Sequence, residues 1–506
     1  MPGETSPVNR DYNAGMNFHI AARAILLVVL SQVSVAANAQ SGQAQHPNIV
    51  IMIADNLGFG DVSANNLGTR GNFRTPNIDA LAAEGLHLTQ FLVEPTCTAS
   101  RAALMTGRYS IRLGLSWFPA GPENTLQPDE VTLAEMLREV GYHTGYIGKW
   151  HLDAETGSQP QNQGFDEWRV GFSGSSDGVL YPAMMAATGA PEEMREYMEY
   201  WIVAARGRGE SSRVRRYDRE YRTQIEADIA ASAAAYVGEH AQHEEPFLLV
   251  IGWTRPHYPN DVAEDFSGRS GAGKYGDSVV ELDFRVGEVL AAIDAAGSEE
   301  ETLVVFLSDN GPTKTTGGAD ELFAGSTGPF RGELGDAYEG SIRTMAAIRW
   351  PGNIPARRSD EMFAIHDLAP TIAALVGAEV PDDRPIDGVD QSDFVLGRSD
   401  RSAREALISF LGDRLVAVRW RQWRIYPVEF LPTQSNPAMG GYTSVISEIG
   451  YPQAFNIDAD PGEMVNIAPV AGWVETPYFQ VIEAYLESLE AHPNPPAHKM
   501  TDFREF

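Results

Sequence analysis

Apolar runs of strand length alternate with helix-period segments along most of this chain. Continuous apolar runs span residues 47–54, 247–251 and 302–307, and each predicts a buried β-strand. Between them, apolar residues recur with helical spacing from Thr75 to Gly85 and from Leu133 to Gly141, and a glycine ends each segment. The alternation predicts the α/β class, with a large, mainly parallel sheet flanked by helices.

The C-terminal part of the chain has its own pattern. A polar stretch from Gly397 to Arg401 separates it loosely from the preceding segments. Apolar runs at 415–420 and 422–426 are spaced like the two strands of a hairpin. We therefore predict a large α/β domain over residues 46–395 and a smaller α+β subdomain over residues 396–506.

The N-terminus resembles an export signal more than a folded element. Arg23 precedes the apolar stretch Ala24–Leu30, and Ala37–Ala39 supplies small residues at cleavage-site spacing. The apolar stretch is too short to span a membrane comfortably. We therefore predict a signal peptide over residues 1–39, cleavage after Ala39, and a periplasmic or secreted protein with no membrane contact after cleavage.

Composition indicates an ordinary globular protein with an acidic surface. Of the 506 residues, 43% are hydrophobic and 21% are charged, which is enough apolar material for a large core. The formal net charge is -31 at pH 7. Because such a charge repels nucleic acids and anionic membranes, we expect neither as a partner.

The single cysteine, Cys97, is the first candidate for a reaction centre. In an exported protein a lone cysteine has no intramolecular disulfide partner, and an exposed thiol would oxidise. It begins a short helical segment that ends at Gly107, so it would lie at a helix N-terminus, where the dipole favours an anion. The alternative is a small buried apolar residue. The polar neighbours Ser100 and Arg101 weaken that alternative.

Two predicted strands each end in an Asp-Asn pair. Asp55-Asn56 follows the first strand, and Asp309-Asn310 follows the strand at 302–307. Ligands gather at the carboxyl ends of strands in open α/β sheets, so these four side chains can supply oxygen ligands to one place. Asp-Asn-Gly taken singly is more often a plain turn. The pairing of the two sequences on strand ends favours a site for a hard cation such as Ca²⁺ or Mg²⁺.

Several motifs together resemble the type I, formylglycine-dependent sulfatases, an arylsulfatase-like group within the alkaline phosphatase superfamily. Cys97–Arg101 is followed at the family spacing by Thr106-Gly107-Arg108. The remaining matches, in chain order, are residues 148–151, 256–259, 367–371 and 460–466. The resemblance therefore covers nearly the whole mature chain, and it implies the family's fold, including a small antiparallel sheet near the C-terminus.

The resemblance implies hydrolysis of a sulfate monoester to an alcohol and inorganic sulfate. In that family a maturation enzyme converts the motif cysteine, here Cys97, into formylglycine, and the hydrated aldehyde is the nucleophile. One divalent cation, Ca²⁺ in preference to Mg²⁺, helps neutralise charge that grows in the transition state. The metal ligands implied are Asp55, Asn56, Cys97, Asp309 and Asn310.

Catalytic roles are implied for the other motif residues. Arg101 would support the nucleophile electrostatically. Lys149 and His151 would stabilise the hydrated aldehyde and handle its proton. They stand two residues apart, so on an extended segment they would share one face. His257 would face the leaving-group oxygen. Ser175 is carried over as a substrate-binding residue, with Ser173 and Ser176 competing for the same place.

The chain departs from the family pattern at two positions. Asn56 stands where the family usually has a second aspartate, which removes one negative charge from the metal site. Leu334 stands where the family commonly has a lysine that contacts the sulfate and leaving-group oxygens. Three explanations remain open: Lys314 supplies the charge from another direction as a substrate-binding residue, His257 acts without help, or the substrate differs.

Three functions therefore compete. Sulfate monoester hydrolysis is favoured, and a phosphonate monoester or phosphodiester hydrolase with the same nucleophile is the alternative. A non-catalytic sulfate-ester-binding protein is the third, although it would not need a convertible cysteine. The acidic surface favours a small or lightly sulfated substrate, either a small molecule or a carbohydrate ester. The aromatic and Arg-rich stretch 178–222 is predicted to select it, mostly as packed helix with a charged outer face.

Overall fold

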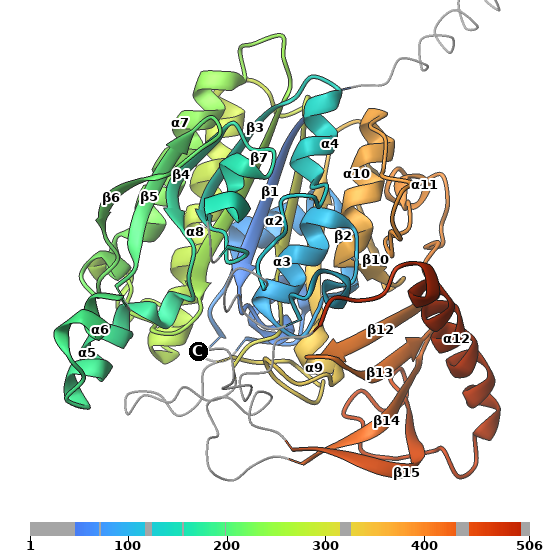
Figure 1. Ribbon diagram of the computed structural model, residues 1–506. Helices are drawn as coiled ribbons and strands as arrows, with labels where there is room; N and C mark the ends of the chain where they lie inside the picture. The colour runs from blue at the N-terminus through green and yellow to red at the C-terminus, as the bar shows by residue number, and fades with distance from the viewer. Residues whose placement is uncertain are drawn as a thin grey trace, which may run out of the picture. The chain divides into compact units, whose positions relative to one another are not determined.

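One large, mostly parallel sheet organises the chain from His46 onward (Figure 1). The computed structural model describes residues 46–69, 72–116, 124–153, 156–197, 199–313, 325–431 and 445–496. Within them, the strands of this sheet are β1 (Asn48–Asp55), β2 (Leu86–Leu92), β3 (His143–Lys149), β4 (Glu167–Phe172), β5 (Trp201–Arg206), β6 (Ser212–Arg216), β7 (Phe247–Pro256), β8 (Thr302–Ser308), β9 (Arg343–Arg349), β10 (Arg357–Ser359) and β11 (Phe363–Ala364).

The strand order is β10-β2-β9-β8-β1-β7-β3-β4-β5-β6, and β11 also pairs with β2. The central strands β8, β1, β7, β3 and β4 are parallel to their neighbours in that run. β9 is antiparallel to both β8 and β2, and β5 and β6 extend the other edge as antiparallel strands. The predicted α/β class with a mainly parallel sheet is confirmed.

Helices cover both faces of the parallel strands, which explains their continuous apolar sequences. Even-numbered residues of β1, such as Val50 and Met52, pack with α2 (Pro76–Glu84), α7 (Ile225–His240) and α8 (Gly273–Ala295). Its odd-numbered residues, such as Ile49 and Ile51, pack on the other face. The helices of that face are α3 (Cys97–Thr106), α4 (Leu133–Glu139) and α10 (Leu368–Val376).

The C-terminal part contains a four-stranded antiparallel sheet in the order β12-β13-β14-β15. The predicted hairpin is present as β13 and β14, and the small antiparallel sheet is confirmed. The bounds are β12 (Ala406–Leu411), β13 (Arg414–Trp420), β14 (Trp423–Leu431), β15 (Val445–Asn456) and the long helix α12 (Glu475–Ala491). The short helices elsewhere are α5 (Tyr181–Ala187), α6 (Glu192–Tyr197), α9 (Glu339–Ile342) and α11 (Ser392–Val395).

Buried ion pairs join the antiparallel sheet to the segments of the large sheet. Arg419 on β13 contacts Glu339 on α9 at 2.7 Å, and both side chains have no exposed area. Arg404, just before β12, pairs with Asp367, which also accepts hydrogen bonds from two backbone amides. Removal of one partner from such a pair leaves an uncompensated charge, so these contacts strongly constrain how the two parts pack. The proposed division at residue 395 stays a prediction.

The stretch 178–222 differs from its sequence-based prediction. Only its first part is helical, in α5 and α6, and these helices have mostly exposed side chains. The second part forms the β5–β6 pair at the sheet edge, with the β6 side chains exposed. The β-branched residues Ile202, Val203 and Val214 in these strands favour a strand over a helix. Among the described residues no helix combines the length and apolar character needed to cross a membrane.

Candidate functional site

The candidate site lies at the carboxyl ends of the central parallel strands. Asp55 is the last residue of β1 and Lys149 the last of β3, while His257 directly follows β7 and Asp309 directly follows β8. In the register of β1 and β8, Ala54 is opposite Ser308, so the residues that come next are neighbours. All four are held by the ends of adjacent strands, as expected for a ligand site in such a sheet.

The two Asp-Asn pairs meet as predicted. The backbone amide of Asn56 donates to Asp309 Oδ1 at 3.1 Å, and Asn310 Nδ2 donates to Asn56 Oδ1 at 2.7 Å. Asn56 has a φ of 67°, in the left-handed region that asparagine tolerates better than most residues. The turn after β1 thereby brings the Asn56 side chain back toward β8, beside Asp309.

The donor set at this corner fits a hard cation. It consists of two carboxylates and two amide side chains, the oxygen-rich chemistry that Ca²⁺ and Mg²⁺ prefer. Asp55 Oδ1 and Asn310 Oδ1 are buried, and no described residue donates a hydrogen bond to either atom. Buried oxygens without a donor are costly, and a cation would satisfy them. The residues present therefore fit the cation that the sequence motifs imply.

Cys97 begins α3 and faces this corner. Thr96 is the N-cap, its side chain accepting a hydrogen bond from the backbone amide of Ala99, and Gly107 ends the helix at a φ of 71°. The predicted place of Cys97 at a helix N-terminus is confirmed. Its Sγ lies 3.9 Å from Asn56 Oδ1. Burial, together with Asp309, raises the pKa of Cys97 to about 12, so the thiol is protonated at neutral pH and is a poor nucleophile.

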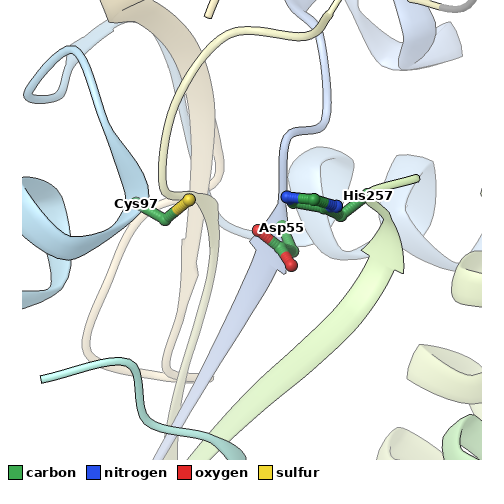
Figure 2. A group of neighbouring side chains, drawn as sticks. All are labelled: Asp55, Cys97 and His257. Atoms are coloured by element: carbon green, nitrogen blue, oxygen red, sulfur yellow. The ribbon is translucent and has the colours of Figure 1, made fainter. Parts of the chain in front are cut away.

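Figure 2 shows the thiol of Cys97, the carboxylate of Asp55 and the imidazole of His257 turned toward one another. One side-chain atom from each of the three lies within 4.8 Å of the others. The three residues come from a helix start and from the ends of two different strands. An atom bound at the centre of this group could therefore contact residue 97, a carboxylate and an imidazole together.

Arg101 links the helix to two of the strands. Its Nε and Nη2 lie 3.0 and 2.9 Å from Asp309 Oδ2, and its Nη1 donates to the carbonyl oxygen of Lys149 at 2.6 Å. The side chain is buried on the first turn of α3 after Cys97. Arg101 thus brings positive charge close to residue 97 while holding Asp309 and the end of β3 in place.

Two glycines make room for this contact. Gly148 on β3 and Gly252 on β7 are opposite each other in register. A Cβ atom on Gly252 would lie 2.1 Å from the carbonyl oxygen of Lys149 and 3.0 Å from Arg101 Nη1. Gly148 has a φ of 89°, and a Cβ there would lie 2.2 Å from the carbonyl oxygen of Gly252. Any side chain at these positions would move the backbone that presents Lys149.

Lys149 forms a fully buried ion pair with Asp55. The Nζ and Oδ2 atoms are 2.8 Å apart, and neither side chain is exposed. Burial by itself would raise the pKa of Asp55, but Lys149, His257 and Arg101 together hold that pKa well below its ordinary value. Asp55 is therefore ionised, as a cation ligand must be.

His151 lies near the same group, but not for the predicted reason. The extended segment ends at Lys149, and His151 has a φ of 63°, so the prediction that both side chains share one face of a strand was wrong. Thr98 holds the turn by donating to the His151 carbonyl at 3.1 Å. Burial, with Lys149 and Arg101 adding to it, holds the pKa of His151 well below its ordinary value. The imidazole is thus neutral and a weak base, with a lone pair that can accept a hydrogen bond.

His257 presents one defined nitrogen to the site. Its Nδ1 lies 2.6 Å from the carbonyl oxygen of Tyr258, an acceptor, so Nδ1 carries the proton. Nε2 is then the atom that faces Ser175 Oγ at 3.3 Å. The backbone hydrogen bond therefore fixes both the tautomer and the direction of the ring.

The three competing serines have three different partners. Ser175 contacts His257, Ser176 donates to Asp55 Oδ2 at 2.9 Å, and Ser173 donates to Asp153 Oδ2 at 2.8 Å. Ser176, named from the sequence only as a competitor of Ser175, is therefore a fixed neighbour of Asp55. Its signal, a serine in a Gly-Ser-Ser stretch, occurs in many loops and carries no information about the partner.

The second departure from the family pattern, Leu334, is buried, and its backbone amide donates to Pro312 O at 3.0 Å. Leu334 therefore contacts Pro312, which follows Asn310 by two residues along the chain. Lys314, the predicted substitute for the missing lysine, lies outside the described residues. Its role stays a prediction.

Sequence reasoning missed Arg222, which holds the loop that carries His257. This buried arginine donates to the carbonyl oxygens of His257 at 2.8 Å, Thr254 at 3.0 Å and Pro259 at 3.2 Å. Its charge is partnered by Glu226 at 3.6 Å. A planar fork with several donors is needed to reach three carbonyls at once, and lysine lacks it.

We expect Arg222→Lys to lower kcat by about 100-fold, because small displacements of a catalytic group have effects on that scale. The matched control is Arg219→Lys, an exposed arginine three residues earlier that pairs with Asp261. The measurements are kcat for a sulfate ester and the melting temperature, each determined for both variants and for wild type. Equal kcat values for Arg222→Lys and wild type, with only the melting temperature changed, would show that Arg222 is merely structural.

The site suits attack on an anionic ester at a metal-supported centre, and comparison with known proteins defines the class. The sulfatase family profile matches residues 47–378. Steryl-sulfatase of Mus musculus is 32% identical over 546 aligned residues, covering 93% of this chain and 86% of that protein. Arylsulfatase A of Homo sapiens is 33% identical over 480 residues, covering 88% and 87%.

The solved structure of PsFucS1 sulfatase from Pseudoalteromonas sp. gives a TM-score of 0.82 at 28% identity, covering 92% of this chain and 95% of that one. The chain belongs to the sulfatase family, whose members hydrolyse sulfate esters. The resemblance found in the sequence motifs and the enzyme class that it implied are confirmed.

Proposed function

We propose that this protein hydrolyses a sulfate monoester, using a formylglycine formed from Cys97 and one divalent cation. The observation that carries the proposal is the meeting of Cys97, Asp55 and His257 within 4.8 Å at the carboxyl ends of the parallel strands. The convergence matters because the three residues are 42 and 160 positions apart along the chain (97 − 55 and 257 − 97).

Asp55, Asn56, Asp309 and Asn310, together with residue 97, would hold the cation. We favour Ca²⁺ over Mg²⁺, because Ca²⁺ accepts carboxylate and amide oxygens in flexible geometry, whereas Mg²⁺ usually keeps several waters. When bound, the cation would polarise the ester and offset charge on the sulfate oxygens. Asn56 replaces a carboxylate, so we expect weaker binding than with two aspartates in the first pair.

Maturation of Cys97 by a formylglycine-generating enzyme would supply a hydrated aldehyde, one hydroxyl for attack on sulfur and the other for release of sulfate. Side chains around residue 97 would orient the nucleophile and supply positive charge beside it. Arg101 and Lys149 both act electrostatically on residue 97. They would favour an anionic nucleophile there and oppose the repulsion between it and the ester.

The two histidines would manage protons. His151 stays neutral because its pKa lies well below the ordinary value, so it would accept a hydrogen bond from the hydrate and take its proton as a weak base. His257 presents Nε2 to the site, and in its protonated form that atom would donate to the leaving alcohol oxygen. Ser175, at 3.3 Å from Nε2, would help to bind the substrate beside it. The predicted export to a periplasm or the medium belongs to the same proposal.

The loss of the family lysine at Leu334 favours a second candidate, phosphonate monoester or phosphodiester hydrolysis with the same nucleophile. Both activities can be measured on one preparation, expressed with a formylglycine-generating enzyme, using 4-nitrophenyl sulfate and 4-nitrophenyl phenylphosphonate. We expect the sulfate ester to have the higher kcat/KM, and EDTA to abolish its turnover reversibly. A higher kcat/KM for the phosphonate would replace the proposed function with the alternative. No turnover of either ester by fully converted protein would favour the binding-protein interpretation.

We expect His257→Ala to lower kcat by about 10²- to 10⁴-fold, the usual contribution of a general acid or base. The loss should fall on kcat more than on KM, as expected for a group that acts in the chemical step. His492→Ala, at an exposed position after α12, is the control and should behave as wild type. Unchanged activity of His257→Ala would remove its proposed role.

A further inference from the structure

A second group of side chains of types that bind metals lies at the other end of the parallel strands, where their amino ends meet. His143 is the first residue of β3, Glu167 is the first of β4, and His240 is the last of α7 (Figure 1). The seven residues of β3 separate this group from Lys149 by about 20 Å. The group therefore lies at the amino ends of the strands and is separate from the sulfatase site at their carboxyl ends.

The three side chains already converge. Glu167 Oε1 lies 4.0 Å from His143 Nε2 and 3.7 Å from His240 Nε2, and one ligand atom of each residue lies within 4.8 Å of the others. The two imidazole rings are stacked, with centroids 4.2 Å apart. Tetrahedral zinc with bonds of about 2.0 Å places its ligand atoms about 3.3 Å apart. Binding would therefore draw the three ligand atoms closer together and turn the two stacked rings apart, so that both Nε2 lone pairs point at the ion.

Neighbouring groups orient the ligand atoms toward this centre. The hydroxyl of Tyr236 can donate to the carbonyl oxygen of Leu248, and it lies 2.9 Å from His143 Nδ1. With its proton directed to the carbonyl, this hydroxyl accepts from Nδ1, which leaves the lone pair of His143 on Nε2, facing Glu167. Ligating histidines commonly have such a partner on the other nitrogen.

Glu167 and His240 also each offer one uncommitted atom. Glu167 Oε2 accepts hydrogen bonds from Arg169 at 2.8 Å and Arg206 at 3.1 Å, so the carboxylate is fixed while Oε1 points at the histidines. His240 Nε2 is buried and has no hydrogen-bond partner among the described residues. Lone pairs of His143 and a carboxylate oxygen that face one another repel unless a cation or proton lies between them.

The group is accessible from solvent. It lines a cavity of about 850 Å³ whose walls also carry Asp166, Glu239 and Glu245. Water could enter there and complete a four-coordinate site with three protein ligands. The acidic side chains raise the local concentration of cations, although Arg138 and Arg206 line the same cavity and limit that effect.

We infer that His143, Glu167 and His240 form a second metal site, for a transition-metal dication and by preference Zn²⁺. Two imidazole nitrogens and one carboxylate oxygen suit zinc better than Ca²⁺, which prefers oxygen alone. The bound ion would link the first residues of β3 and β4 to the last residue of α7.

The test is calorimetric titration of the tag-free, exported protein with Zn²⁺ in saturating Ca²⁺, which keeps the sulfatase site filled. We expect one equivalent to bind. Glu167→Gln and His240→Ala should each weaken it by more than about 100-fold, beyond the usual effect of losing an outer-shell partner. Glu239→Gln removes the same charge from the same cavity without removing a ligand, and it should bind zinc as wild type does.

Replacement of Zn²⁺ by Co²⁺ gives a second measurement. We expect the visible absorption bands of four-coordinate cobalt in wild type and Glu239→Gln, and their absence in Glu167→Gln and His240→Ala. Ca²⁺-dependent sulfate-ester turnover should be unchanged in all three variants, which shows that they are folded and separates this site from the catalytic one. Zinc binding that survives both ligand substitutions, or no binding by wild type at neutral pH, would overturn the proposal.

Discussion

Cys97→Ala is expected to abolish sulfate-ester turnover, with kcat falling by about a millionfold, the scale seen when an enzyme loses its covalent nucleophile. Among the described residues the polar contact of this thiol is a long one, 3.9 Å from Sγ to Asn56 Oδ1, and alanine is the smaller side chain. The ion pair of Lys149 with Asp55 should therefore persist, and the variant should fold.

Two measurements check this prediction. Turnover of Cys97→Ala is compared with that of Met105→Leu, a volume-conserving change in the same buried helix that should be tolerated. Peptide mass spectrometry across residue 97 of wild type should show the thiol replaced by an aldehyde. Turnover by protein that carries only the unmodified thiol would contradict the formylglycine mechanism, because burial raises the pKa of Cys97 to about 12.

Lys149→Met is expected to have the second largest effect, on both stability and activity. The substitution leaves Asp55 buried without its ammonium partner at 2.8 Å. Breaking a buried pair in this way costs about 3–5 kcal/mol in the free energy of unfolding. The loss should be greatest in EDTA and smaller in Ca²⁺, because a bound cation compensates the same carboxylate. With Ca²⁺ present, kcat should still fall by about 10²- to 10³-fold, as when one electrostatic donor is removed.

The control is Lys274→Met, because Lys274 is 46% exposed and lies 3.7 Å from Asp261. An exposed pair contributes about 0–1 kcal/mol, so this variant should unfold nearly as wild type does, with or without Ca²⁺. Denaturant unfolding of the three proteins under both conditions is the measurement. A Lys149→Met variant as stable as the control in EDTA would contradict the burial argument, and equal losses in EDTA and Ca²⁺ would contradict the placement of the cation.

The elements that carry the site were predictable because their signals are local. The strands β1, β7 and β8 are continuous apolar runs, and the Asp-Asn pairs follow two of them directly. Parallel strands place their carboxyl ends at one edge, so the meeting of Asp55 and Asp309 followed from the class of fold. The end of α3 was similarly marked by Gly107.

Other features depended on which strands became neighbours. β9 lies antiparallel between β2 and β8, and nothing in its own sequence distinguishes that direction from a parallel one. The stretch 178–222 was predicted mainly as helix, and its second half pairs with the sheet edge. His151 was expected to share one face of a strand with Lys149. The strand ends at Lys149, and His151 itself has a φ of 63°.

The sequence by itself determined the class of fold, the family and the candidate reactive residues, because apolar periodicity and short motifs are encoded over a few neighbouring positions. Tertiary structure alone decided the partners: Ser176 with Asp55, Arg222 with the His257 loop, and His240 with Glu167. These contacts join residues from separate elements. They depend on strand register and helix packing, which arise from the whole core rather than from any local pattern.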